Sequence, residues 1–372
     1  MAWRETLYKT YLKPILFHFE PEDVHDAGIR LGSFMGRYAV TRQIVRAFFS
    51  AYESPALGQT IHGIYFKNPI GLAAGFDKNA ELTSVIPLIG FGHMEVGSVT
   101  YVPCVGNPKP RLWRLKKSKG LLVYYGLKND GAECIHQRLS GKTFTCPVSV
   151  SIAMTNCQEN LDINKAILDY ANSFKVFLDI GDILTVNISC PNTCGGQPFM
   201  DPDALEKLLS ALDVILTKKP IFVKLSPDKS EVDIDRILEV IARHRVHGII
   251  CSNLTKNREN KKIVDEDVPD KGGVSGKPVQ DLSDNLLEHV YKKTRGKYVL
   301  VGCGGVFNAH DAYRKIRLGA SLIHMITGMI YEGPQVISTI NKDLDILLKK
   351  DGYNSIADAI GVDVLLKAQD FF

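Results

Sequence analysis

Short apolar runs alternate with longer amphipathic segments along most of the chain, from about Asn68 onward. The apolar runs are mostly rich in valine and isoleucine, and they lack strict alternation between polar and apolar residues. Strands that are buried on both faces of a parallel sheet have this pattern. The pattern therefore predicts eight strands, within residues 68–75, 91–100, 147–154, 183–191, 220–227, 248–255, 298–305 and 321–328.

The segments between these runs have the apolar periodicity of helices, for example over residues 203–217, 233–244 and 281–293. Eight successive strand–helix units favour a closed (β/α)8 barrel, or TIM barrel, within the α/β class. An open, doubly wound sheet is the alternative. A barrel takes about 250 residues, so the 372-residue chain has room for an additional segment.

The first fifty or so residues have a different pattern. Apolar side chains recur at helical spacing from Leu7 to Phe19, and Pro21 begins a second predicted helix that extends towards Phe49. Arginines and lysines accompany both segments. Two basic amphipathic helices can pack on a barrel or lie on an anionic membrane surface, and the pattern alone favours packing. We therefore divide the chain into an N-terminal helical region, residues 1–54, and a barrel, residues 55–372.

Composition narrows the class of protein. The net charge is +4 and the basic residues are scattered, which gives little reason to expect a nucleic-acid partner. None of the eight cysteines forms a CxxC pair, so we expect reduced thiols and no metal site. The N-terminus has no secretory signal pattern. No apolar run reaches the roughly 18 residues that a membrane-spanning helix needs.

Polar residues and glycines gather at the carboxyl ends of the predicted strands, where barrels have their active sites. Lys224 stands between Val223 and Leu225 in a predicted buried strand, so its charge needs a partner. Glycines within residues 301–306 follow the seventh strand, and Thr327 and Gly328 follow the eighth. Barrels bind phosphate groups through backbone N–H groups at this place. The anion bound there would be the phosphate of a flavin or a similar ligand.

Lys78 and Lys224 both come from strand ends that face one cavity. One lysine could form a Schiff base, or the lysines could stabilise the negative charge of a reduced flavin. The sequence NISCPNT favours the flavin, because Asn187 and Asn192 flank one ionisable thiol, Cys190. Amides suit a planar heterocycle with alternating donors and acceptors, and an ionised thiol can act as a base.

Many segments, in order along the chain, resemble the dihydroorotate dehydrogenase family. The matching segments are KNPIGLAAGFDKNAE, FGHMEVGSVT, GNPKPRLWRL, NISCPNT, VKLSPD, SNLT, GGVSGKP, VGCGGV and ITGMIYEGP. The N-terminal FEPEDVH is similar to the start of the membrane-associated, quinone-using class 2. The resemblance implies FMN-dependent oxidation of dihydroorotate to orotate, in pyrimidine biosynthesis, with a quinone as electron acceptor. It also implies that the N-terminal helices form a quinone access site on a membrane.

The resemblance also implies roles for individual residues. Cys190 would be the catalytic base that takes the C5 proton while hydride passes from C6 to flavin N5. Lys78 would contact FMN and the substrate carboxylate, and the pyrimidine would bind Asn187, Asn192 and Asn253. The residues implied in FMN binding are Ala74, Gly75, Ser98, Ser151, Lys224, Ser252, Gly276, Gly305, Thr327 and Gly328.

Several positions depart from the family pattern. Val123 stands where the family has an asparagine that binds the pyrimidine, and Leu127, Leu254 and Ile326 replace a phenylalanine, a threonine and a tyrosine. Cysteine as the base, and the segment CGGQPFMDPDALEKL, are typical of class 1, whereas class 2 usually has serine. The residues implied in flavin binding thus largely match the family pattern, whereas several residues of the substrate pocket do not.

These departures leave rival hypotheses. The first is a related flavin oxidoreductase that acts on another dihydropyrimidine or cyclic amide. A non-enzymatic FMN-binding barrel is disfavoured by Cys190, Lys78 and Lys224. A tRNA dihydrouridine synthase would need an RNA-binding domain and a stronger basic face, and an iron–sulfur partner subunit is disfavoured by the class 2-like N-terminus. We expect a peripheral location on the cytoplasmic side of the inner membrane, or a cytoplasmic one.

Overall fold

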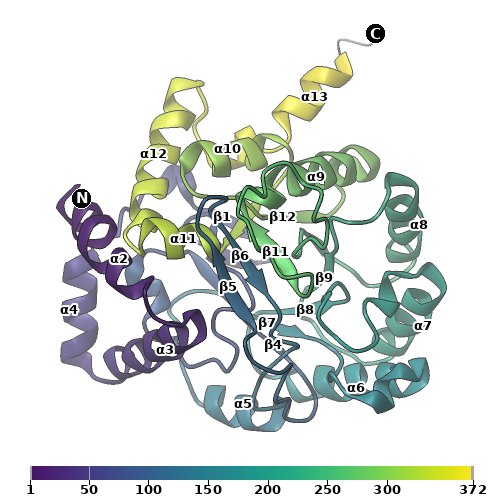
Figure 1. Ribbon diagram of the computed structural model, residues 1–372. Helices are drawn as coiled ribbons and strands as arrows, with labels where there is room; N and C mark the ends of the chain where they lie inside the picture. Colours follow the sequence, from purple (N-terminus) through teal and green to yellow (C-terminus); the bar gives the residue numbers. More distant parts are fainter. Residues whose placement is uncertain (1, 50, 370–372) are drawn as a thin grey trace.

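The computed structural model describes residues 2–49 and 51–369. Eight parallel strands form a closed barrel, in which the last strand pairs with the first (Figure 1). Each strand lies inside one of the eight predicted ranges, so the barrel is confirmed and the open sheet is excluded. In order around the barrel the strands are β3 (Ile70–Leu72), β4 (His93–Val99), β7 (Val148–Ile152), β8 (Ile183–Asn187), β9 (Ile221–Leu225), β10 (Gly248–Cys251), β12 (Val299–Cys303) and β13 (Leu322–Met325).

Helices surround the barrel, and their sequences explain where they begin and which face they bury. The side chains of Asp201 and Ser230 accept hydrogen bonds from backbone N–H groups at the starts of two of them. Leu205, Leu208 and Leu212 form a buried stripe at helical spacing. The helices are α5 (Ala132–Leu139), α6 (Ile163–Val176), α7 (Pro202–Asp213), α8 (Glu231–Ile241), α9 (Gln280–Thr294), α10 (Ala309–Arg317), α11 (Thr327–Glu332), α12 (Val336–Lys350) and α13 (Val362–Gln369).

Two small antiparallel sheets lie outside the barrel, and the sequence pattern predicted neither. The hairpin of β1 (Gln59–Ile61) and β2 (Ile64–Phe66) contributes Phe66 to a buried apolar cluster with residues of five barrel strands, Ile183, Phe222, Ile250, Val301 and Leu322. The second sheet joins β5 (Leu112–Leu115), β6 (Gly120–Val123) and β11 (Gly273–Gly276). Figure 1 shows this sheet across the mouth of the barrel, so its side chains can contribute to a site there.

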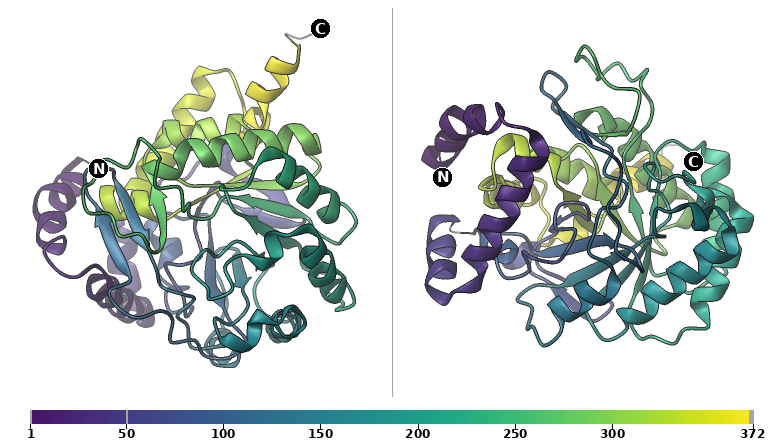
Figure 2. Two further views of the ribbon diagram at one scale, coloured as in Figure 1. Left: turned by 45° about the vertical axis from the view of Figure 1, so that its right-hand side comes forward. Right: turned by 60° about the horizontal axis from the view of Figure 1, so that its bottom comes forward.

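The N-terminal region is helical and lies along one side of the barrel (Figure 2). Its first segment comprises α1 (Ala2–Thr6), a π-helical stretch (Leu7–Leu12) and α2 (Lys13–Leu16). The predicted second helix is wrong in extent, because it is divided into α3 (Pro21–Arg37) and α4 (Ala39–Phe49). Tyr38 between them is extended, and the Thr41 hydroxyl donates to the carbonyl groups of Met35 and Tyr38. These bonds satisfy carbonyl groups where α3 ends, which stabilises the turn.

One side of this region packs on the barrel, and the other side is exposed. The Tyr8 hydroxyl donates to the Ile330 carbonyl at 2.6 Å, and the buried Glu22 forms an ion pair with Arg111. The prediction of packing on the barrel is thus correct for this side. The exposed apolar side chains of the region are Trp3, Leu7, Tyr11, Leu12, Ile15, Phe19, Leu31, Phe34, Tyr38, Val40, Ile44 and Phe48. Among the described residues, no helix has the length and hydrophobicity to cross a bilayer.

Candidate active site

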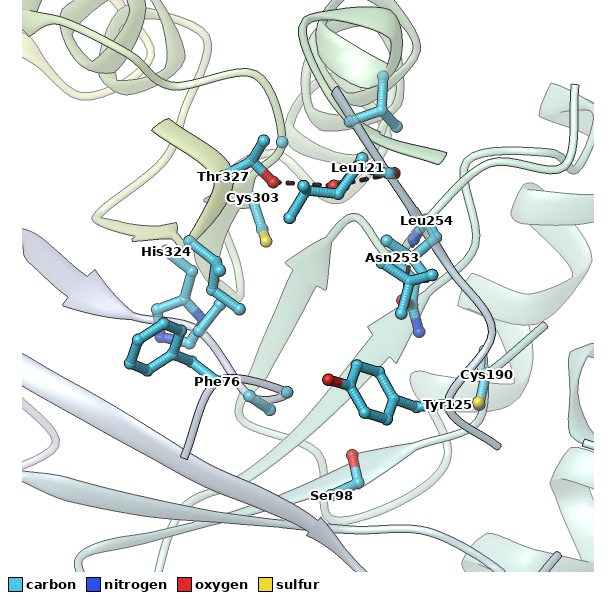
Figure 3. Close-up of a pocket in the computed structure, with 18 of the residues that line it drawn as sticks. Phe76, Ser98, Leu121, Tyr125, Cys190, Asn253, Leu254, Cys303, His324 and Thr327 are labelled. Atoms are coloured by element: carbon cyan, nitrogen blue, oxygen red, sulfur yellow. Dashed lines mark hydrogen bonds between the residues drawn. The ribbon is translucent and has the colours of Figure 1, made fainter. Parts of the chain in front are cut away.

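A cavity of about 200 Å³ lies at the carboxyl ends of the barrel strands. The predicted site residues line it together, with the exception of Ser151. Ser151 is fully buried, and its hydroxyl oxygen is 2.7 Å from the hydroxyl oxygen of Ser98, which lines the cavity. The structure therefore does not place Ser151 in the cavity lining, and its expected contact with a cofactor stays a prediction. Figure 3 shows Ser98, Cys190, Asn253 and Thr327 around the cavity, from four different strand ends.

Hydrogen bonds hold each of the three predicted amides, and the amide nitrogen of Asn253 also donates to the amide oxygen of Asn187 at 3.3 Å. The Asn187 amide nitrogen donates to the Ser98 hydroxyl at 2.8 Å, and the Asn253 amide nitrogen donates to the Ser189 carbonyl at 2.9 Å. The Asn192 amide nitrogen donates to the Val123 carbonyl at 2.9 Å. The Asn192 amide oxygen is buried without a hydrogen-bond partner among the described residues. Buried polar atoms are normally paired, so this oxygen is suited to an N–H group of a ligand.

Lys224 lies in the middle of the barrel wall with 5% of its surface exposed. Within residues 2–49 and 51–369 its ammonium group makes no hydrogen bond and no ion pair. Its charge nevertheless affects a neighbour, because burial together with Lys224 lowers the pKa of His324 to about 3. A buried ammonium without a counter-charge is unfavourable. The geometry therefore calls for a ligand that carries, or acquires, negative charge beside Lys224.

Lys78 follows β3 and is held by aromatic and imidazole groups. Its ammonium nitrogen lies 3.1 Å from His25 Nε2 and 4.0 Å from the centre of the Tyr125 ring. Burial lowers the pKa of Lys78 to about 8, and the charge of Lys128 contributes in the same direction against nearby carboxylates. Because an ammonium group pairs well with a carboxylate, Lys78 is suited to an acidic ligand below this pH.

Cys190 lies in the loop after β8, beside Asn192. Burial raises the pKa of the Cys190 thiol to about 11, although the Asn192 backbone and the Lys224 charge oppose this shift. The group is therefore a thiol near neutral pH. It can take a proton from a ligand only in its small ionised fraction.

Glycine loops form the end of the cavity near β11, β12 and α11. Gly276 and Gly305 have positive φ angles of 83° and 73°. A Cβ atom on Gly276 would lie 2.3 Å from the Lys119 carbonyl oxygen, so the close approach of the two chains requires glycine. The Ser275 and Thr327 hydroxyl oxygens are 2.8 Å apart at the same end. Glycine loops and hydroxyls that line a cavity in this way suit the phosphate of a flavin nucleotide.

Sequence reasoning did not find several residues of the cavity. His25 comes from α3, and Leu112, Leu121 and Tyr125 come from the small sheet and the loop after it. The Tyr125 hydroxyl is buried without a partner among the described residues. The sequence around Tyr125 mixes polar and aromatic residues but has neither helical nor strand periodicity, so it did not predict where these residues lie. In the described residues, no three His, Cys, Asp or Glu side chains are arranged to hold a metal ion.

The fold and the cavity define a (β/α)8-barrel enzyme with a lysine, amide and thiol site at its strand ends. The family described as dihydroorotate dehydrogenase matches residues 56–348. The chain is 38% identical to a dihydroorotate dehydrogenase (quinone) of Natronomonas pharaonis, across 95% of this chain and 98% of the relative. It is 35% identical to the Nostoc punctiforme protein of the same name, across 97% and 99% of the two chains.

Solved structures of dihydroorotate dehydrogenases are also similar to this chain. The ligand-free dihydroorotate dehydrogenase of Eimeria tenella superposes with a TM-score of 0.82 at 29% identity, covering 92% of this chain and 99% of that chain. The complex of the Eimeria tenella enzyme with ferulenol gives a TM-score of 0.80. The chain therefore belongs to the dihydroorotate dehydrogenase family. The predicted family and the prediction of an oxidoreductase of this kind are confirmed.

Proposed function

We propose that this protein binds FMN, oxidises dihydroorotate to orotate in pyrimidine biosynthesis, and passes the electrons to a quinone. The names of the full-length relatives support the reaction and the acceptor. The observation that carries the proposal is the unpaired, buried Lys224 ammonium in the same cavity as Cys190 and the amides. Steady-state formation of orotate from dihydroorotate, with a soluble quinone as acceptor, tests the proposal as a whole.

FMN is the cofactor that these residues fit. Lys224 would neutralise the negative charge of the reduced ring, with Ser98 and Ser252 beside the ring. The phosphate would lie at the glycine loops. The bound cofactor would supply a hydride acceptor. The proposed cofactor-binding residues are Ala74, Gly75, Ser98, Lys224, Ser252, Gly276, Gly305, Thr327 and Gly328.

The residues of the chain would bind the substrate and accept its proton. The Lys78 ammonium would pair with the carboxylate, and the amides of Asn187, Asn192 and Asn253 would hold the ring. The buried Asn192 oxygen would accept a ring N–H group. The Cys190 thiolate would take the C5 proton as the C6 hydride leaves, so that a carbon–carbon double bond forms between these atoms.

One wall of the cavity is apolar, which supports a second class of substrate. Val123, Leu127 and Leu254 line the cavity and offer no side-chain hydrogen bond. Asn129, which could have substituted for the missing family asparagine, does not line the cavity, and its amide nitrogen donates to the Thr100 hydroxyl and the Leu127 carbonyl. A dihydropyrimidine or cyclic amide with an apolar edge would therefore fit this wall.

Val123→Asn separates the two substrate classes. If dihydroorotate lies against Val123, part of its amide edge has no partner, which costs about 1–3 kcal/mol. The asparagine variant should then raise kcat/KM for dihydroorotate by roughly 5- to 150-fold. Val123→Ala is the control, because it adds space without a hydrogen-bonding group. A fall in kcat/KM with asparagine, at unchanged FMN content, would favour the ligand with an apolar edge.

We also propose that the exposed apolar side of the N-terminal region rests on a membrane and admits the quinone. Leu31, Phe34, Val40 and Ile44 on α3 and α4 are exposed, and arginines accompany them. Amphipathic helices with basic flanks bind anionic lipid surfaces. The cavity reaches α3 at His25, so an apolar acceptor in the membrane would have a short route to the cofactor. This arrangement corresponds to peripheral attachment on the cytoplasmic side of an inner membrane.

Charged substitutions on this side should abolish attachment. Leu31 is 63% exposed and Ile44 is 55% exposed, so Leu31→Asp with Ile44→Asp should not disturb the folded chain. Losing two inserted side chains, each worth about 1.5 kcal/mol or more, should weaken co-sedimentation with anionic vesicles by at least about 100-fold. Leu168→Asp, on α6 and 59% exposed, is the matched control. Equal vesicle binding by all three proteins would refute the proposed attachment.

A further inference from the structure

A side chain of the N-terminal region reaches the proposed substrate site directly. His25 lies on α3, and its Nε2 atom is 3.1 Å from the Lys78 ammonium nitrogen. The His25 ring packs edge-on against Phe76, with ring centres 5.0 Å apart. On another side of Lys78, the Tyr125 ring centre is 4.0 Å from the ammonium nitrogen. The Lys78 head group is therefore fixed between a ring that accepts a hydrogen bond and an aromatic face.

The direction of the hydrogen bond follows from the chemistry of the two groups. A lysine ammonium can only donate, so His25 accepts through Nε2 and carries its proton on Nδ1. Burial and the charges of Lys78 and Lys128 hold the pKa of His25 well below its usual value. The imidazole is therefore neutral near pH 7, which is the form that can accept from Lys78.

Charged groups from three elements surround this pair. Asp26 and Glu22 come from α3, as does His25, and their charges favour the ammonium form of Lys78. Asp77, next to Lys78 in the loop after β3, acts in the same direction. Lys128, from the loop after the small sheet, opposes it. The helix that faces the proposed membrane side thus contributes most of the acidic groups that stabilise the charge on Lys78.

We propose that His25 is a positioning residue for the substrate: it holds the Lys78 ammonium over Tyr125, where the carboxylate of the substrate binds. The inference rests on the proposed substrate-binding role of Lys78. It makes α3 a part of the substrate site, in addition to any role on the quinone side. Binding of the acidic substrate or product should then depend on a residue outside the barrel.

Two substitutions test the role of the imidazole. His25→Phe keeps an aromatic ring of similar size but removes the hydrogen-bond acceptor. The Lys78 ammonium then loses its bond to His25 while its surroundings remain equally apolar. His25→Gln restores an acceptor oxygen. We expect His25→Phe to weaken orotate binding by about 3- to 10-fold and His25→Gln to remain close to the parent. Calorimetric titration of the FMN-loaded, oxidised protein with orotate measures this without quinone or turnover.

The pH dependence provides a second readout. Orotate binding needs protonated Lys78, whose pKa is about 8, so the affinity of the parent should decline above that pH. Without the His25 acceptor the ammonium form of Lys78 is less favourable. The decline in orotate affinity should therefore begin at lower pH in His25→Phe than in the parent. His18→Phe is the control, since His18 is exposed in the same region and its ring bonds the Pro14 carbonyl, outside the cavity lining.

The outcomes separate this inference from the proposed function. Weaker binding and an earlier decline in His25→Phe, both reversed in His25→Gln, would support the inference. Parent-like binding by His25→Phe, together with weak binding by Lys78→Met, would overturn the role of His25 and leave the proposed role of Lys78 intact. Parent-like binding by both variants would overturn the role of Lys78 and the inference with it.

Discussion

Cys190→Ala is expected to slow the reduction of bound FMN by dihydroorotate by about 10²- to 10⁴-fold, the usual contribution of a general base. The thiol lies in the cavity, beside the amides that would orient the substrate. Alanine cannot accept the C5 proton, so the C5–H bond would have to break without a general base. Anaerobic stopped-flow measurement of flavin absorbance at saturating dihydroorotate gives the rate directly.

The pH profile of the parent identifies the base. With the pKa of Cys190 at about 11, the rate at saturating substrate should rise roughly tenfold per pH unit across the neutral range. The value of kcat/KM should rise only to about pH 8, because above the pKa of Lys78 the loss of the ammonium offsets the gain in thiolate. Cys194→Ala, in the same loop and exposed, is the control. A Cys190→Ala variant at the parent rate, or a flat profile, would exclude Cys190 as the base.

Glu22→Ala should destabilise the whole protein by about 3–5 kcal/mol, because it leaves a buried arginine without its counter-charge. Glu22 is 0% exposed, and its carboxylate accepts from Arg111 at 2.7 and 2.9 Å and from Lys128 at 3.3 Å. Denaturant unfolding of the purified protein measures the loss. The control is Glu5→Ala, since the Glu5–Lys9 pair is largely exposed and pairs of that kind contribute only about 0–1 kcal/mol.

Acid should have a related effect. Burial disfavours the Glu22 carboxylate, but its bonds to Arg111 and the charge of Lys128 outweigh burial and lower its pKa to about 2. Its folded pKa is thus below the unfolded value, so the stabilisation is present above about pH 4.5 and is lost as the pH falls towards 2. The alanine variant should lose less stability than the parent over this interval. An equal loss in both would mean that the ion pair contributes little.

Contacts between the N-terminal region and the barrel show that residues 1–54 and 55–372 are not structurally independent. The N-terminal region supplies Glu22 to Arg111 and His25 to Lys78, so deleting it removes both partners from the barrel. A truncated protein would fail for structural reasons as well as for loss of a quinone route. Surface substitutions such as Leu31→Asp are therefore a cleaner test of the membrane-facing side.

The sequence predicted the barrel because its strands have a local signature. A run such as Ile221–Leu225 is buried throughout and apolar except for Lys224, and short runs of this kind, spaced regularly between amphipathic segments, indicate strands of a parallel sheet. The sheet of β5, β6 and β11 lacked such a signature. Leu112–Leu115 mixes apolar and charged residues, and Val274 of β11 pairs with Leu122 of β6, far away in the sequence. Pairing of that kind depends on the assembled barrel.

The same distinction applies to the candidate site. Lys224, Asn187 and Cys190 were predicted to share a cavity because strand ends of a barrel converge, and they do. His25 and Tyr125 could not be placed, since their positions depend on how α3 and the small sheet dock on the barrel. Ser151 was assigned to the flavin site from the resemblance to the family. The alternation of side chains could not reveal that Ser151 is fully buried with its hydroxyl against that of Ser98.

Anaerobic titration of the FMN-loaded protein with dihydroorotate tests the central proposal most directly. The proposal predicts that the protein binds one FMN per chain, that dihydroorotate bleaches the flavin absorbance, and that one orotate forms for each flavin reduced. Adding a quinone should then restore the oxidised spectrum. A folded, FMN-loaded protein whose flavin is bleached by dithionite but stays oxidised with dihydroorotate would contradict the account, as would a folded protein that takes up no FMN.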